Sequence, residues 1–527
     1  MSGQHDQEQD NVERLAHEEE TFVVPDEQNE EDDARLRAEL EELSDLGEED
    51  DAGLDFLDED EMQLGVELDG DLEMGEDEDT SVFTFSKHED AVLNCCFLNP
   101  WTFCTSGQDD QAYVVSLQKS TSSGSSASSS STSVVAADRE SSDNTTGDVD
   151  MADSTERNRN SDIKEPCVEP GQEPLELVSV AALEKHTDSV IAVARNHSRT
   201  EVCTVGYDGV THVHKVAVDP SNRSVSATLS HTLEGPGAEL EWGCWHPKGN
   251  IVLAGSADTT TWMWHGDSGH CMQVFSGHQD GVTCGGFIQG GKLIATGCKD
   301  GQVIVWAPKS GQSVDRLQVV HEQEITCLGD TNQVDVAASG LSKTQVQNLF
   351  AVGTSEGEVH LLTMLETGKG KVVKSFTPAH EGAVEVVSFQ PRVAGTWQPD
   401  IFLATAALDG KVKMWNLRNF HAVHDVQAHE CGGVTALKWT PGGELLISGS
   451  LDWTARVWSP HTGDCLHTFC GHQDSILALD VLLADDAGDR ELDEKDKNAR
   501  WKTLQVVTAS DDKTAKVWRW RFSPFLL

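Results

Sequence analysis

Basic side chains are scarce in this sequence. It contains 38 lysines and arginines against 90 aspartates and glutamates, which gives a formal net charge of −52. The phosphate backbone of DNA or RNA repels a chain this anionic, so direct nucleic-acid binding is not expected and a basic partner is favoured. The basic cluster within residues 369–374 is too short to change this conclusion.

Long apolar runs are also lacking. No stretch reaches the ~18 to 20 apolar residues that a membrane span needs, and residues 1–10 are too polar for a secretory signal. The 13 cysteines are odd in number and scattered through predicted strands, as is typical of small core residues in a reducing compartment. We therefore expect a cytoplasmic protein, with the nucleus as a second compartment.

Catalytic signatures are missing as well. The sequence has no glycine-rich phosphate loop, no nucleophile elbow and no paired-carboxylate site. Cysteines and histidines cluster at residues 465–472 as in a zinc site, but Cys465 and His467 alternate along a predicted strand, where zinc ligands would need a tight knuckle. We predict no catalytic residue, no metal site and no cofactor, and hence a protein that is not an enzyme.

The acidic charge is concentrated at the beginning of the chain. Residues 1–80 hold 34 acidic and 3 basic side chains, with few aromatic residues and no sustained periodicity. Burial in such a segment cannot offset the entropy of ordering it, so a disordered tail is expected over residues 1–80. Within residues 32–46, three leucines at helical spacing leave open a short amphipathic segment that folds on a partner.

The rest of the sequence repeats one pattern. Between Gly277 and Trp306, a Gly-His pair precedes short alternating segments separated by glycine-rich turns, and Asp300 stands six residues before Trp306. Alternation with period two predicts antiparallel strands. The acidic position recurs eight times, at Asp109, Asp208, Asp258, Asp300, Glu356, Asp409, Asp452 and Asp512. Repeats of roughly 40 to 45 residues with a Gly-His opening and a Trp close are typical of WD repeats, which form four-stranded propeller blades.

We therefore predict an all-β, eight-bladed WD40 propeller over residues 81–527. Val82–Phe85 should close the ring as an outer strand beside Ala515–Trp520, which removes an open sheet edge. A serine-rich disordered insertion at 119–171, a charged loop at 484–500 and shorter insertions at 219–224, 329–344 and 391–399 should all open on one face.

Four repeats can form buried hydrogen-bonded chains that fix a turn rather than perform catalysis. These chains comprise His278, Thr296, Asp300 and Trp306; His380, Thr405, Asp409 and Trp415; His429, Ser448, Asp452 and Trp458; and His472, Thr508, Asp512 and Trp518.

The opposite face should carry short loops that are rich in carboxylates. Gathered around one ring, they would produce a negative field that attracts a basic segment, although acidic turns in an acidic protein are the plainer interpretation. Candidate partner-binding residues on this face are Glu89, Asp90, Asp110, Asp188, Tyr207, Glu239, Glu241, Trp242, Asp280, Glu322, Glu324, Glu381, Glu430, Trp453 and Asp474, with Asp511 nearby.

The third repeat departs from the pattern. It lacks the Gly-His pair and contains Glu239-Leu-Glu-Trp242-Gly-Cys-Trp245-His-Pro, followed by Leu253-Ala-Gly-Ser-Ala-Asp258. Together with the eight repeats and the acidic tail, this sequence resembles the angio-associated migratory cell protein family, over roughly residues 80–527. The resemblance implies a binding role, because fungal relatives are chaperones that hold the basic N-terminal segment of a large-subunit ribosomal protein, while animal relatives are linked to cell migration.

The predicted function is capture of a basic ribosomal-protein segment on the acidic face by a monomeric, non-enzymatic propeller. Two alternatives stay open. One is a scaffold or adaptor in signalling, cell migration or ubiquitin ligation. The other is a histone-type chaperone that acts through the acidic tail.

Overall fold

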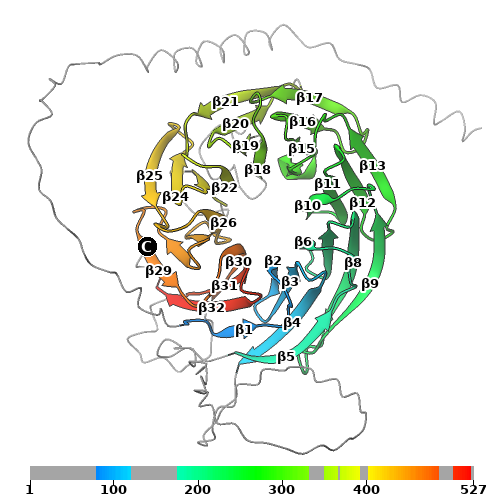
Figure 1. Ribbon diagram of the computed structural model, residues 1–527, viewed down its shortest axis with the longest axis vertical. Helices are drawn as coiled ribbons and strands as arrows, with labels where there is room; N and C mark the ends of the chain where they lie inside the picture. The colour runs from blue at the N-terminus through cyan, green and yellow to red at the C-terminus, as the bar shows by residue number, and fades with distance from the viewer. Residues whose placement is uncertain are drawn as a thin grey trace, which may run out of the picture. The chain divides into compact units, whose positions relative to one another are not determined.

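The computed structural model describes residues 79–119, 175–330, 349–365, 368–391, 401–485 and 502–523. These residues form eight four-stranded antiparallel sheets, which stand as blades around a common centre (Figure 1). The eight-bladed propeller predicted from the repeats is confirmed. The predicted tail and the insertions at 119–171 and 484–500 lie outside the described residues, apart from a few flanking positions.

The first four blades follow chain order, each from its innermost to its outermost strand. They are blade 1, β2 (Val92–Asn99), β3 (Thr102–Gly107), β4 (Ala112–Lys119) and β5 (Leu175–Ala182); blade 2, β6 (Val190–Arg195), β7 (Glu201–Gly206), β8 (Val210–Val218) and β9 (Val225–Glu234); blade 3, β10 (Leu240–Trp245), β11 (Ile251–Ser256), β12 (Thr260–His265) and β13 (Cys271–Ser276); and blade 4, β14 (Cys284–Ile288), β15 (Leu293–Gly297), β16 (Gln302–Trp306) and β17 (Ser313–Gln318).

The other four blades are given below from the innermost to the outermost strand, and in blade 4 a 3-10 turn, η3 (Gln289–Gly291), lies between β14 and β15. They are blade 5, β18 (Ile325–Asp330), β19 (Leu349–Thr354), β20 (Val359–Met364) and β21 (Gly370–Phe376); blade 6, β22 (Val384–Phe389), β23 (Phe402–Ala407), β24 (Lys411–Asn416) and β25 (His421–Gln427); blade 7, β26 (Val434–Trp439), β27 (Leu446–Ser450), β28 (Ala455–Trp458) and β29 (Cys465–Phe469); and blade 8, β30 (Ile476–Asp485), β31 (Lys502–Ser510), β32 (Ala515–Phe522) and β1 (Phe83–Phe85).

The hydrophobic core lies between neighbouring blades rather than at the centre of the ring. In one cluster, Val303 and Val305 of blade 4 pack against Val352 and Leu362 of blade 5. A middle strand such as β19 is buried on both faces because a blade flanks it on each side, whereas most of the outer strand β17 is exposed. No helix in the described part of the chain has the length and apolar character needed to cross a membrane.

Blade 8 is built from both ends of the propeller sequence, and the predicted closure is confirmed. Strand β1 pairs antiparallel with β32, with Phe83 opposite Val517 and Phe85 opposite Ala515. Val82 and Phe85 are buried in the cluster that joins blade 8 to blade 1. The pairing covers the outer edge of β32, which is the usual way a propeller ring protects its last blade.

The innermost strands share a β-bulge that the sequence pattern did not predict. In seven blades the register shifts around the second residue of the inner strand: Leu93, Ile191, Glu241, Thr326, Glu385, Thr435 and Leu477. A bulge inserts one residue into a strand and re-aims its side chain. Thr435 uses this to donate to the Ile476 carbonyl of the next blade, at 2.5 Å.

Candidate functional site

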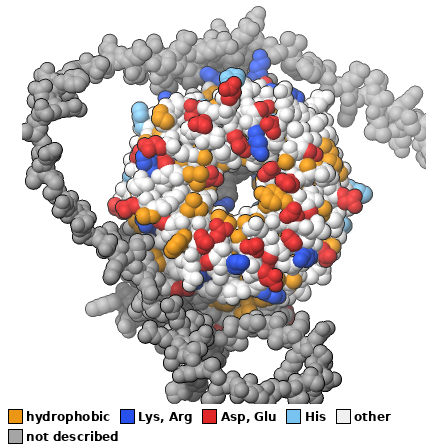
Figure 2. Space-filling view, viewed as in Figure 1, with side chains coloured by type: hydrophobic (Ala, Val, Ile, Leu, Met, Phe, Trp, Pro, Cys, Tyr) orange, Lys and Arg blue, Asp and Glu red, His pale blue; other side chains and the backbone are white. Residues whose placement is uncertain are grey.

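Short loops open on one face of the ring, as predicted. They join the second strand of each blade to the third, and the fourth strand to the next blade, and we call this side the short-loop face. The turn at 219–224 joins β8 to β9 and so opens on the other side. On the face drawn in Figure 2, acidic side chains are spread around the ring and hydrophobic side chains gather beside the central opening.

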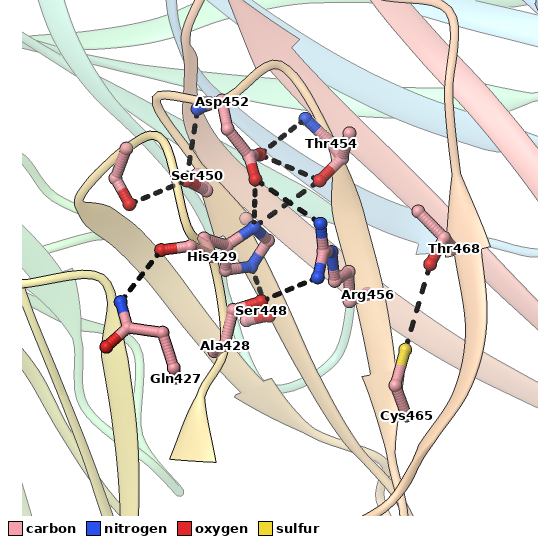
Figure 3. Close-up of polar contacts among 12 residues, drawn as sticks. Gln427, Ala428, His429, Ser448, Ser450, Asp452, Thr454, Arg456, Cys465 and Thr468 are labelled. Atoms are coloured by element: carbon pink, nitrogen blue, oxygen red, sulfur yellow. Dashed lines mark hydrogen bonds and ion pairs between the residues drawn. The ribbon is translucent and has the colours of Figure 1, made fainter. Parts of the chain in front are cut away.

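The predicted hydrogen-bonded chains are complete in blades 6 and 7. In blade 7, His429 contacts Asp452 through Nδ1 at 2.7 Å and Ser448 through Nε2 at 2.9 Å (Figure 3). Trp458 Nε1 donates to the same serine at 2.8 Å. The Asp452 carboxylate also accepts from the backbone and hydroxyl of Thr454, which fixes the turn.

The other two predicted chains are incomplete. In blade 8, His472 contacts Asp512 and Thr508, but Trp518 Nε1 is buried without a partner among the described residues. In blade 4, His278 contacts Thr296, but its Nδ1 makes no hydrogen bond to Asp300. The prediction of a full chain was wrong in these two blades, because the sequence spacing does not fix the side-chain rotamers that close it.

Two further chains were missed by sequence reasoning. His88 bridges Asp109 and Thr105 in blade 1, and His186 bridges Asp208 and Thr204 in blade 2. Their aromatic slot holds Val115 and His214 instead of tryptophan, so the pattern looked degenerate. The signal was available in the spacing. In both blades a histidine stands 17 or 18 residues before a threonine, and the aspartate follows that threonine by four residues.

These chains stabilise the fold and are poorly placed for catalysis. Burial alone would raise the pKa of the Asp409 carboxyl, but hydrogen bonds from His380 and from the Lys411 and Glu381 backbone outweigh it and hold the pKa at about 2. The His380 side chain is fully buried in this network. A carboxylate already saturated with donors and closed off by packing does not serve as a general base.

Most of the predicted partner-binding residues reach solvent on the short-loop face. The exposed set comprises Glu89, Asp90, Asp188, Tyr207, Glu239, Asp280, Glu322, Glu381, Glu430, Trp453 and Asp474. Asp110, Glu241, Trp242 and Glu324 are half-buried.

Three of the predicted carboxylates are partly neutralised by lysines. Lys185 lies 3.8 Å from Asp110. Lys513 lies 3.8 Å from Asp90, and Lys411 lies 3.4 Å from Glu381. Exposed pairs of this kind contribute little to stability, about 0 to 1 kcal/mol, but they reduce the negative field over blades 1, 6 and 8.

The carboxylates around Tyr207 have no such cation. Asp188, Glu239 and Glu241 surround Tyr207, and burial followed by these three charges raises the pKa of its phenol. Among the described residues, no lysine or arginine lies within 4.0 Å of any of the three. Beside them a pocket of about 280 Å³ is lined by Tyr207, Asp208, Gly237, Ala238, Glu239 and Ala257. We call the pocket, together with the three carboxylates around Tyr207, the blade 2–3 pocket.

Two other acidic groups lie around the ring. Burial and the charges of Asp474, Asp512 and Asp90 raise the pKa of Asp511. Burial and Glu324 raise the pKa of Glu385, a residue that sequence reasoning did not select. Glu385 and Glu241 occupy the same bulge position of their inner strands, and the bulge breaks the alternation from which a sequence reading assigns side chains to faces.

Two predicted tryptophans differ in role. Trp242 Nε1 donates to the Val282 carbonyl of blade 4 at 3.1 Å, and its ring lies where a Cβ on Gly255 or Gly285 would be, so it mainly packs blades 3 and 4 together. Trp453 is 48% exposed at a turn with φ of +72°.

Comparison with known proteins supports the repeat assignment. The family model "WD domain, G-beta repeat" matches residues 227–265, 269–307, 420–459 and 463–519. The human angio-associated migratory cell protein is 29% identical over 347 residues, which span 63% of this chain and 68% of that protein.

Solved structures show the same fold. Sqt1 from Saccharomyces cerevisiae superposes with a TM-score of 0.60 at 15% identity, over 84% of this chain and 99% of that one. Sqt1 from Chaetomium thermophilum, bound to the N-terminus of the ribosomal protein L10, superposes with a TM-score of 0.58 at 18% identity, over 84% of this chain and 100% of that one. The chain is therefore an eight-bladed β-propeller that contains WD repeats and is similar in sequence to the angio-associated migratory cell proteins.

Proposed function

We propose that this protein is a non-enzymatic chaperone that captures a basic segment of a large-subunit ribosomal protein on its short-loop face. The observation that carries the proposal is the blade 2–3 pocket, where unpaired carboxylates gather around an exposed tyrosine. Like charges held together repel one another in the free protein, and an incoming cation relieves that repulsion.

A lysine or arginine side chain suits the pocket chemically. Its aliphatic stem can lie against Tyr207, whose ring can also contact the cationic head, while the head reaches Glu239 and Asp188. The acidic groups at Asp511 and Glu385 would receive further basic residues of the same segment around the ring. Such a segment is better protected from competing polyanions while it is bound.

The comparisons support this partner by analogy. A propeller of the same fold, Sqt1 of Chaetomium thermophilum, has been crystallised with the N-terminus of the ribosomal protein L10. The shared fold alone does not assign a partner, because unrelated functions use one fold. Charge complementarity is the independent argument, since the chain has a net charge of −52.

The test is titration of the purified chain with a peptide of the N-terminus of ribosomal protein L10 from the same organism. Replacing Asp90, Asp188 and Glu239 together by lysine should weaken binding at least ~100-fold, about 2.7 kcal/mol. All three are exposed, so the fold should tolerate the change. We prefer Glu239 to Glu241 here because Glu241 is half-buried.

A matched control changes the same charge elsewhere. Asp219, Asp267 and Asp464 are exposed, and each lies in a connection from a third to a fourth strand on the opposite face, so replacing them by lysine should change affinity less than ~5-fold. If both triple variants weakened peptide binding equally, net charge alone would explain the loss, and this would contradict a site on the short-loop face. Unchanged affinity in the first variant would overturn the proposal.

The same binding assay separates the alternatives. If the acidic tail carries the function, a chain that starts at residue 78 should lose peptide binding while the propeller stays folded. If the protein is a scaffold, affinity purification should recover several unrelated partners whose binding is insensitive to charge reversal in the blade 2–3 pocket.

A further inference from the structure

Blade 4 holds a cluster of metal-binding side chains that its structural role leaves unexplained. His278 precedes β14, and Cys298 and Asp300 follow β15. One ring nitrogen of His278, the Cys298 sulfur and an Asp300 carboxylate oxygen all lie within 4.8 Å of one another. His278 and Cys298 are buried, and Asp300 is half-buried.

The five equivalent histidines in other blades show what is unusual here. Each contacts its aspartate through Nδ1, at 2.9 Å in blade 1, 3.0 Å in blade 2, 3.1 Å in blade 6, and 2.7 Å in blades 7 and 8. His278 Nδ1 is equally buried but makes no hydrogen bond within the described structure. A buried polar atom without a partner costs about 1 to 3 kcal/mol, so this nitrogen calls for a ligand.

The surrounding hydrogen bonds are compatible with a metal-binding tautomer of His278. The Thr296 hydroxyl accepts from Trp306 Nε1 at 2.8 Å and lies 2.7 Å from His278 Nε2. It can donate its own proton to the Ile304 carbonyl, at 3.4 Å. In the tautomer with Nε2 protonated, His278 Nε2 donates to Thr296 and the lone pair on Nδ1 is free for a metal ion. A histidine held by such an outer partner is the usual arrangement of a metal ligand.

Cys298 is the substitution that distinguishes this blade. The equivalent residues of blades 7 and 8 are Ser450 and Ser510, whose hydroxyls accept from the amides of Asp452 and Asp512. Ser450 and Ser510 donate to the Gly432 and Asp474 carbonyls, and the Cys298 thiol makes the equivalent contact with the Asp280 carbonyl at 3.2 Å, so here a sulfur takes the place of a hydroxyl oxygen.

We propose that His278, Cys298 and Asp300 bind a zinc ion, with water as the fourth ligand. The nitrogen, sulfur and oxygen donors are those that zinc accepts, and the two anionic ligands cancel its charge. Zinc–ligand bonds of ~2.0 to 2.3 Å place tetrahedral ligands roughly 3.5 Å apart, so the donors must close by about an ångström.

Arg316, a cation next to His278, does not prevent this. It donates to the Gly277 carbonyl at 2.8 Å. The thiolate and the carboxylate together outweigh that single charge. Because the ion displaces a proton from Cys298, its affinity should increase with pH.

The test uses the full chain, stripped with a chelator and titrated with Co²⁺ and then Zn²⁺. The wild type should bind one equivalent of cobalt with a sulfur-to-metal charge-transfer band, which zinc abolishes. Cys298→Ser restores the serine of blades 7 and 8, so it should fold, yet it should lose this equivalent and at least 100-fold in affinity. Asp300→Asn keeps the oxygen that accepts from Gln302 and should weaken binding at least 10-fold.

Cys465→Ser is the matched control, because Cys465 is an exposed thiol outside the cluster. It should leave the cobalt band and stoichiometry unchanged. Zinc should also raise the melting temperature of the wild type and of Cys465→Ser but not that of Cys298→Ser. An identical cobalt spectrum and stoichiometry for wild type and Cys298→Ser would overturn the proposal, as would the absence of any equivalent in the wild type.

Discussion

One residue position recurs in every blade with a left-handed backbone. It follows the repeat's acidic residue, and its φ lies between +63° and +81°. Four blades place glycine there, at Gly209, Gly301, Gly357 and Gly410, and four place Asp110, Thr259, Trp453 and Lys513. An L-residue with a side chain pays roughly 1 to 2 kcal/mol for this conformation. Trp453 is the bulkiest of them and half of it faces solvent, which favours a role in binding.

Trp453→Gly should therefore weaken partner binding without destabilising the protein. Glycine removes the left-handed strain, and this gain should offset the lost packing to within about 1 kcal/mol. We expect an unchanged melting temperature and about 10-fold weaker binding of the ribosomal peptide. Lys513→Gly makes the same backbone change but frees Asp90 and the Glu89 carbonyl, so it serves as the control for stability and should not weaken peptide binding. A melting temperature that falls by more than ~4 °C would show that the indole is needed for packing instead.

Residue roles were predictable where spacing alone determines them. The histidine, hydroxyl and aspartate of blades 6 and 7 follow from the repeat and meet as expected. Trp242 was predicted on the partner surface but packs between blades, because its inner strand bulges at the preceding residue. Glu385 was missed, although Glu241 at the equivalent bulge position was predicted. Neither the bulge nor the pocket beside Tyr207 has a local sequence signal.

At the scale of elements, blade 8 depends on a strand of only three residues. β1 supplies Phe85, which packs edge-on against Phe103 and Tyr113 of blade 1. Val82 is buried beside it, and its amide donates to the Val517 carbonyl at 2.9 Å. The strand thus both covers the edge of β32 and joins two blades, and its sequence pattern, Val82–Phe85, was sufficient to predict this role.

Removing β1 should destabilise the whole propeller. A chain that starts at residue 87 loses the Phe85 side chain, whose removal alone typically costs 3 to 5 kcal/mol, and exposes the β32 edge. We expect a melting temperature at least ~8 °C below that of a chain starting at residue 78, and a tendency to aggregate. Differential scanning calorimetry of the two chains provides the comparison. Coincident transitions would mean that blade 8 is held closed by other contacts.

Blade 3 shows how an element can keep its place without the usual residues. It has no histidine in the repeat position, but Asp258 accepts from the Thr260 amide at 2.9 Å, as Asp452 and Asp512 accept from the equivalent threonines. Trp264 donates to the Glu234 carbonyl rather than to a threonine. The loop that would hold the repeat histidine instead carries Gly237, Ala238 and Glu239, which line the pocket. The repeat that fits the pattern least therefore supplies much of the candidate site.

At the scale of the whole molecule, buried histidines and hydrogen-bonded carboxylates both make the folded protein less stable at acidic pH. Burial lowers the pKa of His278 to about 4, and burial with neighbouring histidines lowers the pKa of His212 to about 4 and of His214 to about 3. An unfolded histidine titrates near 6.5, so between about pH 6.5 and 4 the unfolded chain binds more protons. Stability must fall as the pH falls through that window.

A second loss follows below this range. The pKa of Asp409 is held at about 2 against burial by its hydrogen bonds, and those of Asp452 and Asp512 are lowered in the same way. Their stabilisation is complete above an unfolded pKa near 3.9 and disappears as the pH falls toward the folded value. The raised pKa values of Asp511 and Glu385 favour the folded state at low pH, but these two groups are outnumbered by the carboxyls whose pKa is lowered.

We therefore expect the melting temperature of the metal-free chain to fall continuously from pH 7 to pH 3, in spite of the fall in net negative charge. A single fully shifted histidine contributes on the order of 3 kcal/mol, since each pKa unit corresponds to ~1.4 kcal/mol. His214→Phe keeps a ring in the slot that five blades fill with tryptophan and removes one titrating group. Its melting temperature should depend less on pH between 6.5 and 4 than that of the wild type. If both proteins were instead stabilised on acidification, repulsion among the 90 carboxylates would outweigh these buried groups.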